Sequence, residues 1–310
     1  MVAPPAKFRN LSGVTWTQPL TPLLKWRILR RFETRVWWPG HEVAVPVRHN
    51  DGRALAEDGT HLTWIGHATF AVRLGGRLVL TDPIWGDCVD LRRLRPPGVA
   101  LRHLPPVDVV TVTHNHYDHC HLPTLRWLAK RFDPHFVVPR RVGRILRGVD
   151  IHRVTELDWW EHVDVGGLRV TLVPAQHWSA RGPFDTNRTL WGGFVYAAPD
   201  GVAYHAGDTA YAPDVFDAIA RRFVIDWAML PIGAYDPEWF LRTQHMGPED
   251  AARAFERLRA RHFVAMHHGT FRLTDEPLDE PLRRCRADMA ARGWTDRLIA
   301  LEIGETKSLR

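Results

Sequence analysis

The chain has 310 residues, of which 45% are hydrophobic and 25% are charged, a composition that excludes a disordered, collagen-like or coiled-coil protein. Eight basic and two acidic residues within the first fifty account for the whole formal net charge of +6. The remaining residues are neutral as a set, which disfavours DNA or RNA as the main substrate, and no nucleic-acid partner is expected.

Neither a membrane-spanning helix nor a secretion signal is predicted. No run of about 18 apolar residues occurs, and the start MVAPPAKFRN lacks the apolar core of a signal peptide. We therefore expect a cytoplasmic protein. Cys88, Cys120 and Cys285 show no CxxC spacing, which argues against a disulfide framework or a thiolate zinc site.

The first predicted unit is a basic, Trp-rich N-terminal arm over residues 1–54, and residues 55–310 form the second unit. Within the arm, four apolar residues recur at four-residue steps between Leu23 and Trp38: Leu24, Ile28, Phe32 and Val36. Basic residues flank them, so this stretch is a candidate for peripheral contact with the inner face of a membrane. The alternative is ordinary packing of the arm on the second unit.

From residue 61 onward, short β-branched and aromatic runs bounded by Gly, Pro or Asp predict strands. They cover residues 61–72, 76–82, 107–114, 168–177, 201–208, 263–267 and 298–305. A helix is predicted over residues 248–263, with Pro248 in its first turn and Ala251, Phe255 and Leu258 on one face. Strands that alternate with helices indicate an α/β protein.

Two segments resemble each other weakly. Residues 70–82 and 194–208 each read as a strand, a Gly-containing turn, a second strand and an acidic residue. This repeat suggests a duplicated β-layer.

The segment HNHYDH places four metal-capable side chains directly after a predicted buried strand: His114, His116, Asp118 and His119. Histidine and carboxylate are ligands that zinc and similar divalent ions prefer. Three further predicted strands end in a ligand-type residue, at His177, Asp208 and His267. Seven ligands are more than one tetrahedral ion can bind. They suit two ions that share a bridging carboxylate, and each ion then keeps a coordination position for water, as in a catalytic site.

HNHYDH matches the HxHxDH signature of the metallo-β-lactamase superfamily. WIGHATFAV, LTDPIW, PAQHW, TLWGGF, AGDTAY, PIGAYDPEWF, QHMGPEDA and MHHGTF resemble, in order and approximate spacing, the N-acylphosphatidylethanolamine-hydrolysing phospholipase D family. The resemblance runs from about His61 to Glu305 and does not include the arm. It implies an αββα sandwich of two mixed sheets flanked by helices, with the metals at one edge of the sheets.

The resemblance also implies a binuclear zinc centre, with manganese or iron as alternative metals. It places His114, His116 and His177 on one ion, places Asp118, His119 and His267 on the other, and makes Asp208 the bridge. His268 stands where the family pattern has Trp. Successive side chains of an extended strand point to opposite faces, so only one of the two adjacent histidines should reach the metals, and the resemblance favours His267.

The remaining candidates lie next to these ligands. Asp82 is expected either to accept a ring N–H from a ligand histidine or to form an ordinary Asp-Pro turn. His67 is interpreted as a buried histidine with its hydrogen bonds satisfied, rather than as a catalyst. Tyr117 either contacts the substrate phosphate or packs beneath the metals.

Gln244 and His245 are candidate substrate contacts, and His245 and Asp118 are the candidate catalytic residues. The implied reaction is phospholipase D-type cleavage of an N-acylated phosphatidylethanolamine-like lipid by a hydroxide that bridges the metals, with His245 or a metal-bound water protonating the leaving group. Two alternatives stay open. One is a hydrolase of a small soluble phosphorylated ester or lactone, and the other is a metal-binding membrane or partner-binding protein without turnover.

Overall fold

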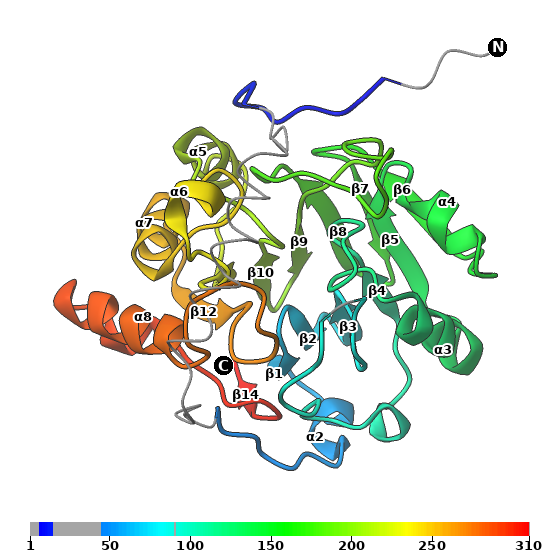
Figure 1. Ribbon diagram of the computed structural model, residues 1–310. Helices are drawn as coiled ribbons and strands as arrows, with labels where there is room; N and C mark the ends of the chain where they lie inside the picture. The colour runs from blue at the N-terminus through cyan, green and yellow to red at the C-terminus, as the bar shows by residue number, and fades with distance from the viewer. Residues whose placement is uncertain (1–5, 15–44, 90, 310) are drawn as a thin grey trace.

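The computed structural model describes residues 6–14, 45–89 and 91–309. Its strands form two seven-stranded sheets (Figure 1). The first sheet, in spatial order, comprises β14 (Thr306–Ser308), β1 (His61–Gly66), β2 (Thr69–Leu74), β3 (Arg77–Thr81), β4 (Val109–Thr111), β5 (His135–Pro139) and β6 (Val154–Leu157). The second comprises β13 (Leu298–Ile299), β12 (His262–Met266), β11 (Trp227–Pro231), β10 (Gly201–His205), β9 (Gly193–Ala198), β8 (Leu168–Val173) and β7 (His162–Val165).

Both sheets are mixed. In both, the antiparallel pairs of consecutive strands come first in sequence and the parallel pairs follow. β1, β2 and β3 are antiparallel neighbours, after which β3 to β6 run parallel. In the second sheet β8, β9 and β10 are antiparallel, and β10 to β13 run parallel. The segments that resemble each other, 70–82 and 194–208, contain the antiparallel hairpins β2–β3 and β9–β10, one in each sheet.

Helices cover the outer faces of both sheets, because each sheet is apolar on two sides and must bury both. The helices are α2 (Arg53–Ala56), α3 (Leu122–Phe132), α4 (Val142–Arg147), α5 (Pro213–Ala220), α6 (Glu238–Leu241), α7 (Pro248–Leu258) and α8 (Glu280–Ala291), with 3-10 turns at Leu101–His103 and Thr295–Arg297. Leu125 of α3 and Leu146 of α4 join the core on the outer side of the first sheet. Phe216 of α5 and Phe255 of α7 join the core that includes the second sheet.

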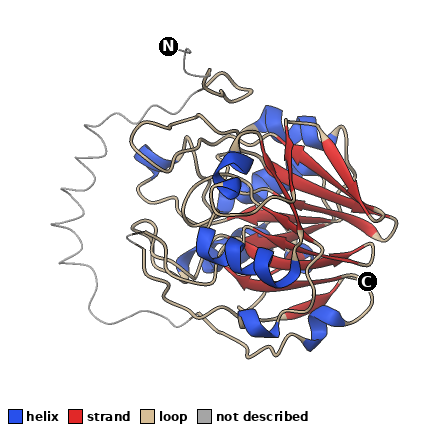
Figure 2. Cartoon of the chain, turned by 90° about the vertical axis from the view of Figure 1, so that its right-hand side faces the viewer, coloured by secondary structure: helices blue, strands red, loops and turns tan. Residues whose placement is uncertain are grey.

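The inner faces of the sheets pack on each other through one apolar cluster. Trp64 and Phe70 of the first sheet share it with Phe194 and Tyr196 of the second, and all four are fully buried. Figure 1 shows the resulting layers, with α3 and α4 on one side and α5, α7 and α8 on the other. The expected αββα sandwich is confirmed. Figure 2 shows the strands of both sheets gathered in one block, with long loops beside it.

The bounds of the predicted elements differ from those in the structure, as three examples show. The strand predicted over 61–72 is a hairpin, because Gly66 and His67 have φ of 125° and 55° and turn the chain between β1 and β2. The helix predicted over 248–263 ends at Leu258, since Arg259 has φ of 53°, and its last residues begin β12.

The strand predicted over 298–305 keeps only Leu298–Ile299 in the second sheet. Residues 300–305 carry the chain across to the first sheet, where Gly304 N donates to Trp64 O at 2.7 Å before β14 pairs with β1.

The predicted boundary near residue 55 stays a prediction, and the stretch from Leu23 to Trp38 lies outside the described residues. Among the described residues, no helix is long and apolar enough to cross a membrane.

Candidate metal centre

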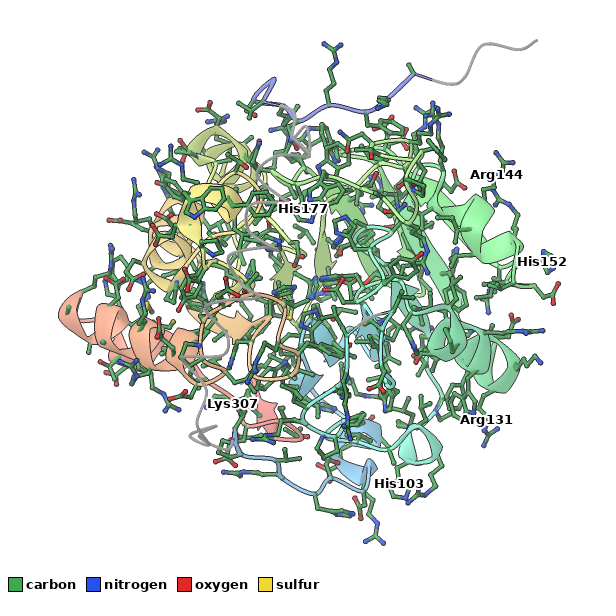
Figure 3. The ribbon with its side chains drawn as sticks, in the orientation of Figure 1. His103, Arg131, Arg144, His152, His177 and Lys307 are labelled. Carbon is green, nitrogen blue, oxygen red and sulfur yellow. The ribbon has the colours of Figure 1, made fainter. Side chains whose placement is uncertain are left out.

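The candidate ligands lie beyond the carboxyl ends of strands that share one direction. In the first sheet β1, β3 and β4 run parallel to one another, and in the second sheet β8, β10 and β12 do so. Carboxyl ends of parallel strands meet at one sheet edge, where α/β proteins place their ligands. The residues that follow these ends are His67, Asp82 and His114 in the first sheet, and His177, Asp208 and His267 in the second. The labelled His177 lies centrally in Figure 3, whereas His103 and His152 lie at the periphery.

One group of donor atoms comes from three histidines. His114 Nε2 lies 2.9 Å from His116 Nδ1, and His177 Nε2 lies 3.3 Å from the same atom. All three donor atoms lie within 4.8 Å of one another. Three imidazole nitrogens turned toward one point suit a divalent cation, which still has positions for other ligands.

The second group contains both histidine and carboxylate. His119 Nε2 lies 3.3 Å from His267 Nε2, and Asp118 Oδ2 lies 3.5 Å and 3.8 Å from these two nitrogens. His67 Nε2 approaches Asp118 Oδ2 to 3.1 Å and belongs to the same group. The interpretation of His67 as a satisfied buried histidine did not anticipate that its partner is a candidate ligand.

Asp208 faces both groups. Its Oδ1 lies 2.9 Å from His267 Nε2, and its Oδ2 lies 3.2 Å from His119 Nε2. The same Oδ2 lies 3.8 Å from His177 Nε2 and 3.9 Å from His114 Nε2. This position matches the bridging role that the resemblance implies.

A buried carboxylate holds the outer nitrogen of His119 directly and that of His114 through the Thr113 hydroxyl. His119 Nδ1 lies 2.7 Å from Asp82 Oδ2. The Thr113 hydroxyl donates to Asp82 Oδ2 at 2.7 Å and stands 3.0 Å from His114 Nδ1, and the Thr113 amide donates to Asp82 Oδ1 at 2.7 Å. A carboxylate that orients the ring of a histidine ligand in this way fixes its tautomer and increases its basicity. Of the two alternatives for Asp82, the structure shows the contact with a ligand histidine.

Three residues around the site have left-handed backbone conformations. His67, Asp82 and His267 have φ of 55°, 38° and 61°. Such values are uncommon for residues with a side chain, and they concentrate where surrounding contacts enforce them. The left-handed conformation also explains how the two adjacent histidines separate. β12 ends at Met266, so His267 turns toward Asp208 outside the strand, rather than by the strand alternation that was expected.

His268 lies elsewhere. Its ring centroid is 4.8 Å from that of Trp64, and it belongs to none of the ligand groups among the described residues.

The charges in the site favour cations. Burial opposes ionisation of Asp118 and Asp208, but the neighbouring histidines outweigh it, and the pKa of each carboxyl is held well below its usual range. Burial lowers the pKa of His116 to about 4, and it lowers the pKa of His114 and His177 well below the usual value. Ionised carboxylates and neutral imidazoles are the protonation states that metal binding requires.

His119 differs from these three histidines. Its burial is outweighed by Asp208, Asp118 and Asp82, which raise its pKa well above the usual value. A metal ion bound at its Nε2 would therefore replace a proton.

The donor set therefore fits divalent metal ions. His116 Nε2 and His245 Nδ1 are also buried and have no hydrogen-bond partner within the described residues, which points to further polar ligands at this place. Nitrogen and oxygen donors without cysteine suit zinc, manganese or iron; Cys120 is buried but stands outside the groups formed by the described residues.

The sequence profile described as the β-lactamase superfamily domain matches residues 77–268. These residues contain the HNHYDH segment and all the candidate ligands described above except His67. The chain belongs to the metallo-β-lactamase superfamily.

Relatives within the superfamily include an uncharacterised protein of Mycobacterium tuberculosis, 39% identical over 73% of this chain and 63% of its own length. This chain therefore spans less than two thirds of that relative. The N-acyl-phosphatidylethanolamine-hydrolyzing phospholipase D 1 of Caenorhabditis elegans is 33% identical over 76% of this chain and 72% of that protein. A mitochondrial protein of the same descriptive name from Saccharomyces cerevisiae is 31% identical over 86% of this chain and 59% of its own length.

Solved structures share the fold at lower identity. Igni18, a metallo hydrolase from Ignicoccus hospitalis, is similar with a TM-score of 0.63 at 23% identity, over 80% of this chain and 97% of that chain. An isothiocyanate hydrolase from Delia radicum gut bacteria has a TM-score of 0.63 at 22% identity, over 80% and 98% of the two chains.

A cleft of about 490 Å³ reaches the candidate ligands. His116, Asp118 and Asp208 line it together with Tyr117 and His245. Its remaining walls are largely apolar and include Val89, Leu91, Trp178, Phe240, Leu241 and Leu273. Tyr117, expected either at the phosphate or beneath the metals, is 36% exposed and donates its hydroxyl to Arg181 O at 2.6 Å.

Arg181 is a residue of this cleft that the sequence analysis did not identify. Its guanidinium lies 4.1 Å from the Tyr117 ring centroid, and Nη1 donates to the carbonyl oxygens of Asn115 and Cys120 at 2.9 Å and 2.8 Å. Arg181 thus ties the HNHYDH loop to the loop after His177. No short motif marks an arginine in this role, because its partners are backbone atoms far away in the sequence.

Gln244 and His245 differ in their exposure and in the atoms that they contact. Gln244 is 3% exposed, and its backbone oxygen lies 2.8 Å from His177 Nδ1, so its clearest contact is with a ligand. The His245 side chain is 14% exposed, and its Nδ1 lies 3.9 Å from Asp208 Oδ2. Burial, opposed by Asp208, lowers the pKa of His245 to about 4. His245 therefore lies where the cleft meets the candidate ligands.

Proposed function

We propose that this protein is a metal-dependent hydrolase of phosphodiesters, and that its substrate is an N-acylated phosphatidylethanolamine-like lipid cleaved on the head-group side of phosphorus. The observation that carries the proposal is the division of the cleft into a His/Asp floor and largely apolar walls. A ligand site of this kind selects a molecule with one polar reacting centre and an apolar body. The names of the nematode and yeast relatives support the same substrate class.

His114, His116 and His177 would hold one metal ion, Asp118, His119 and His267 the other, and Asp208 would contact both. Two divalent ions in such a site lower the pKa of a bound water and neutralise charge that develops on phosphoryl oxygens. We propose two zinc ions, with manganese or iron as substitutes.

The protein's own residues contribute position and hydrogen bonds. Asp82 and Thr113 orient the rings of His119 and His114, and Arg181 keeps the HNHYDH loop in place. His245 lies at the boundary between the ligands and the cleft, where it would contact the oxygen of the leaving head group. We propose that it assists departure of that alkoxide.

The reaction is tested by product analysis in H₂¹⁸O. The substrates are N-acylated and free phosphatidylethanolamine, phosphatidylcholine, a soluble chromogenic phosphodiester and a lactone phosphate, presented to the metal-loaded protein. Cleavage between phosphorus and the head-group oxygen should yield phosphatidic acid carrying the label and an unlabelled N-acylethanolamine. Label in the alcohol product, or cleavage of a fatty acyl ester, would contradict the proposed reaction.

The open alternatives are distinct outcomes of the same assay. Preference for the lactone phosphate would identify a hydrolase of small soluble substrates. No turnover of any substrate by protein that holds its metals would favour a binding protein. Asp118→Asn serves as the matched inactive control, because it keeps the side-chain size and removes the charge that faces His119 and His267.

His245 has its own test. His245→Ala should lose more activity on phosphodiesters with poor leaving groups than on those with good ones, because only a poor leaving group needs assistance. Equal losses for both substrate types would remove this role.

We also propose that the protein is cytoplasmic and contacts the inner face of the membrane through the stretch from Leu23 to Trp38. The pattern of apolar and basic residues in its sequence supports this. Co-sedimentation with anionic vesicles should be lost when Leu24, Ile28, Phe32 and Val36 are replaced by serine, and equal binding of the wild type and this variant would contradict the idea.

A further inference from the structure

The residue that fixes the backbone of His177 comes from the other end of the chain. Asn10 is 6% exposed, and its Nδ2 donates to His177 O at 2.9 Å, while His177 N donates to its Oδ1 at 3.2 Å. One side-chain amide thus binds both peptide groups of a candidate metal ligand, as a neighbouring strand would do. The two residues are 167 positions apart in the sequence.

The hydrogen-bonding capacity of Asn10 is fully used. Its second Nδ2 proton goes to Val14 O at 2.8 Å, and its Oδ1 also accepts from Trp191 Nε1 at 3.0 Å. A side-chain amide offers two donors and two acceptor sites, so each has a partner. The orientation of the amide is therefore determined, since exchanging oxygen and nitrogen would break all four bonds.

His177 needs this support because no strand holds it. β8 ends at Val173, and His177 lies in the loop that leads to β9. Its ring is held at Nδ1 by Gln244 O, but a ring contact alone does not fix the Cα position.

The backbone of the preceding residue, Gln176, is held by Thr209 Oγ1 at 3.0 Å and by Ala210 N at 2.9 Å. Asn10 supplies the bonds to the N–H and C=O of His177 itself, whose Nε2 points toward His116.

Contacts on both sides of Asn10 hold the segment 6–14 in place. Before it, Phe8 N donates to Asn187 O at 2.8 Å, and Arg141 Nη1 donates to Ala6 O at 2.8 Å. After it, the Ser12 hydroxyl donates to Gln176 Oε1 at 2.7 Å. The segment is therefore bound to the β8–β9 loop on both sides of His177, at Gln176 before it and at Asn187 after it.

We propose that Asn10 is a positioning residue for the metal ligand His177, so that the N-terminal segment 6–14 is part of the metal centre. The proposal concerns metal binding and holds whichever substrate the enzyme cleaves. Outer partners of metal ligands are commonly worth about 10–100-fold in metal affinity, and this is the effect expected of Asn10.

Two variants test the proposal. Asn10→Ala removes all four bonds, whereas Asn10→Asp keeps the acceptor for His177 N and Trp191 but places a carboxylate oxygen against the carbonyls of His177 and Val14. Both should bind one of two metal ions about 10–100-fold more weakly in competition with a chromogenic chelator, and should leave the other ion close to wild type. The visible absorption of the cobalt-substituted protein, which reports coordination, should change in both.

Asn50→Ala is the matched control. Asn50 also has partners for both amide protons and for its oxygen: it donates to Gly304 O at 2.8 Å and Thr306 Oγ1 at 3.0 Å and accepts from Gly52 N at 2.8 Å. Its loss should lower the melting temperature without changing metal affinity or the cobalt spectrum.

Ser12→Ala, at an exposed position, tests the same segment without a threat to folding and should weaken the same ion by a smaller factor, about threefold. Wild-type metal affinity and an unchanged cobalt spectrum in the folded Asn10 variants, or in Ser12→Ala where those do not fold, would overturn the proposal. If the wild-type protein binds its metals as expected but cleaves no lipid, only the proposed function is contradicted.

Discussion

The two sheets have the same pattern of strand pairing, yet residues at corresponding positions have different roles in the site. β1 to β4 correspond to β8 to β11, because each set consists of three antiparallel strands followed by a parallel one. His67 follows β1 where His177 follows β8, and Asp82 follows β3 where Asp208 follows β10.

The two aspartates show the difference most clearly. Asp82 is turned outward from the ligand groups and binds the amide and hydroxyl of Thr113 and the outer nitrogen of His119. Asp208 is turned inward, and its oxygens face ring nitrogens of both groups. The repeated backbone thus places an aspartate after the corresponding strand of each sheet. The contacts of its side chain then decide whether that aspartate is a candidate ligand or orients one.

The strongest test of a centre shared between the two sheets is removal of the metals. The purified protein should contain close to two divalent ions per chain, because the donors form two groups joined by Asp208. Chelation should abolish hydrolysis, and zinc or manganese should restore it. Active protein that contains a single tightly bound ion, measured by elemental analysis, would refute the binuclear arrangement.

The next largest effect should separate the two aspartates. Asp208→Asn removes the charge that faces both groups and should lower metal content and reduce activity by more than 100-fold. Asp82→Asn leaves the inner donors in place and should cost about 10–100-fold, as outer partners of metal ligands do. Elemental analysis and rates on the same substrate compare the two directly, and equal metal loss in both variants would show that their roles do not differ.

Several candidate ligands could be identified in the sequence because they follow short β-branched runs. VDVVTVTH and FVAMH end in histidine, and the strand direction then brings both to one edge of the sandwich. Local sequence carries this information, since strand propensity and the ligand types of metals are both properties of single residues.

Other parts of the site could not be predicted in this way. The turn at His67 was read as continuous strand, because its left-handed backbone is imposed by tertiary contacts such as the bond from its amide to Thr270 Oγ1 at 2.8 Å. Asn10 meets His177 only in the folded chain, and an isolated asparagine has no pattern. Gln244 holds His177 by its backbone oxygen, which any residue type provides, so its identity gave no signal for that role.

The two adjacent histidines provide the third comparison. His267→Ala removes a donor that lies 2.9 Å from Asp208 Oδ1, so one ion should be lost and activity should fall by more than the 10–100-fold of an outer partner. His268→Ala removes a ring that contacts Trp64 and should leave both ions bound with at most a modest loss of activity. Loss of an ion in His268→Ala, with full loading in His267→Ala, would show that the assignment is wrong by one residue.

The smallest effect is expected at His67, which follows β1 as His177 follows β8. His177→Ala should lose one ion, since its Nε2 is one of three nitrogens in the first group. His67 instead bonds to Asp118 Oδ2 at 3.1 Å. It therefore orients a ligand, so its replacement should retain both ions and cost activity by roughly 10-fold. Asparagine is the suitable replacement, because it tolerates the left-handed conformation at φ 55° while it is too short to reproduce the contact of the ring.

His135→Asn controls for the loss of a hydrogen-bonded histidine away from the site, since His135 begins β5 and bonds to Thr155 Oγ1 at 2.8 Å. It should keep full activity and metal content. If His67→Asn loses an ion as His177→Ala does, then His67 is itself a ligand. In that case each of the corresponding strands β1 and β8 would be followed by a histidine that binds a metal ion, and the duplication would extend from the backbone to the metal chemistry.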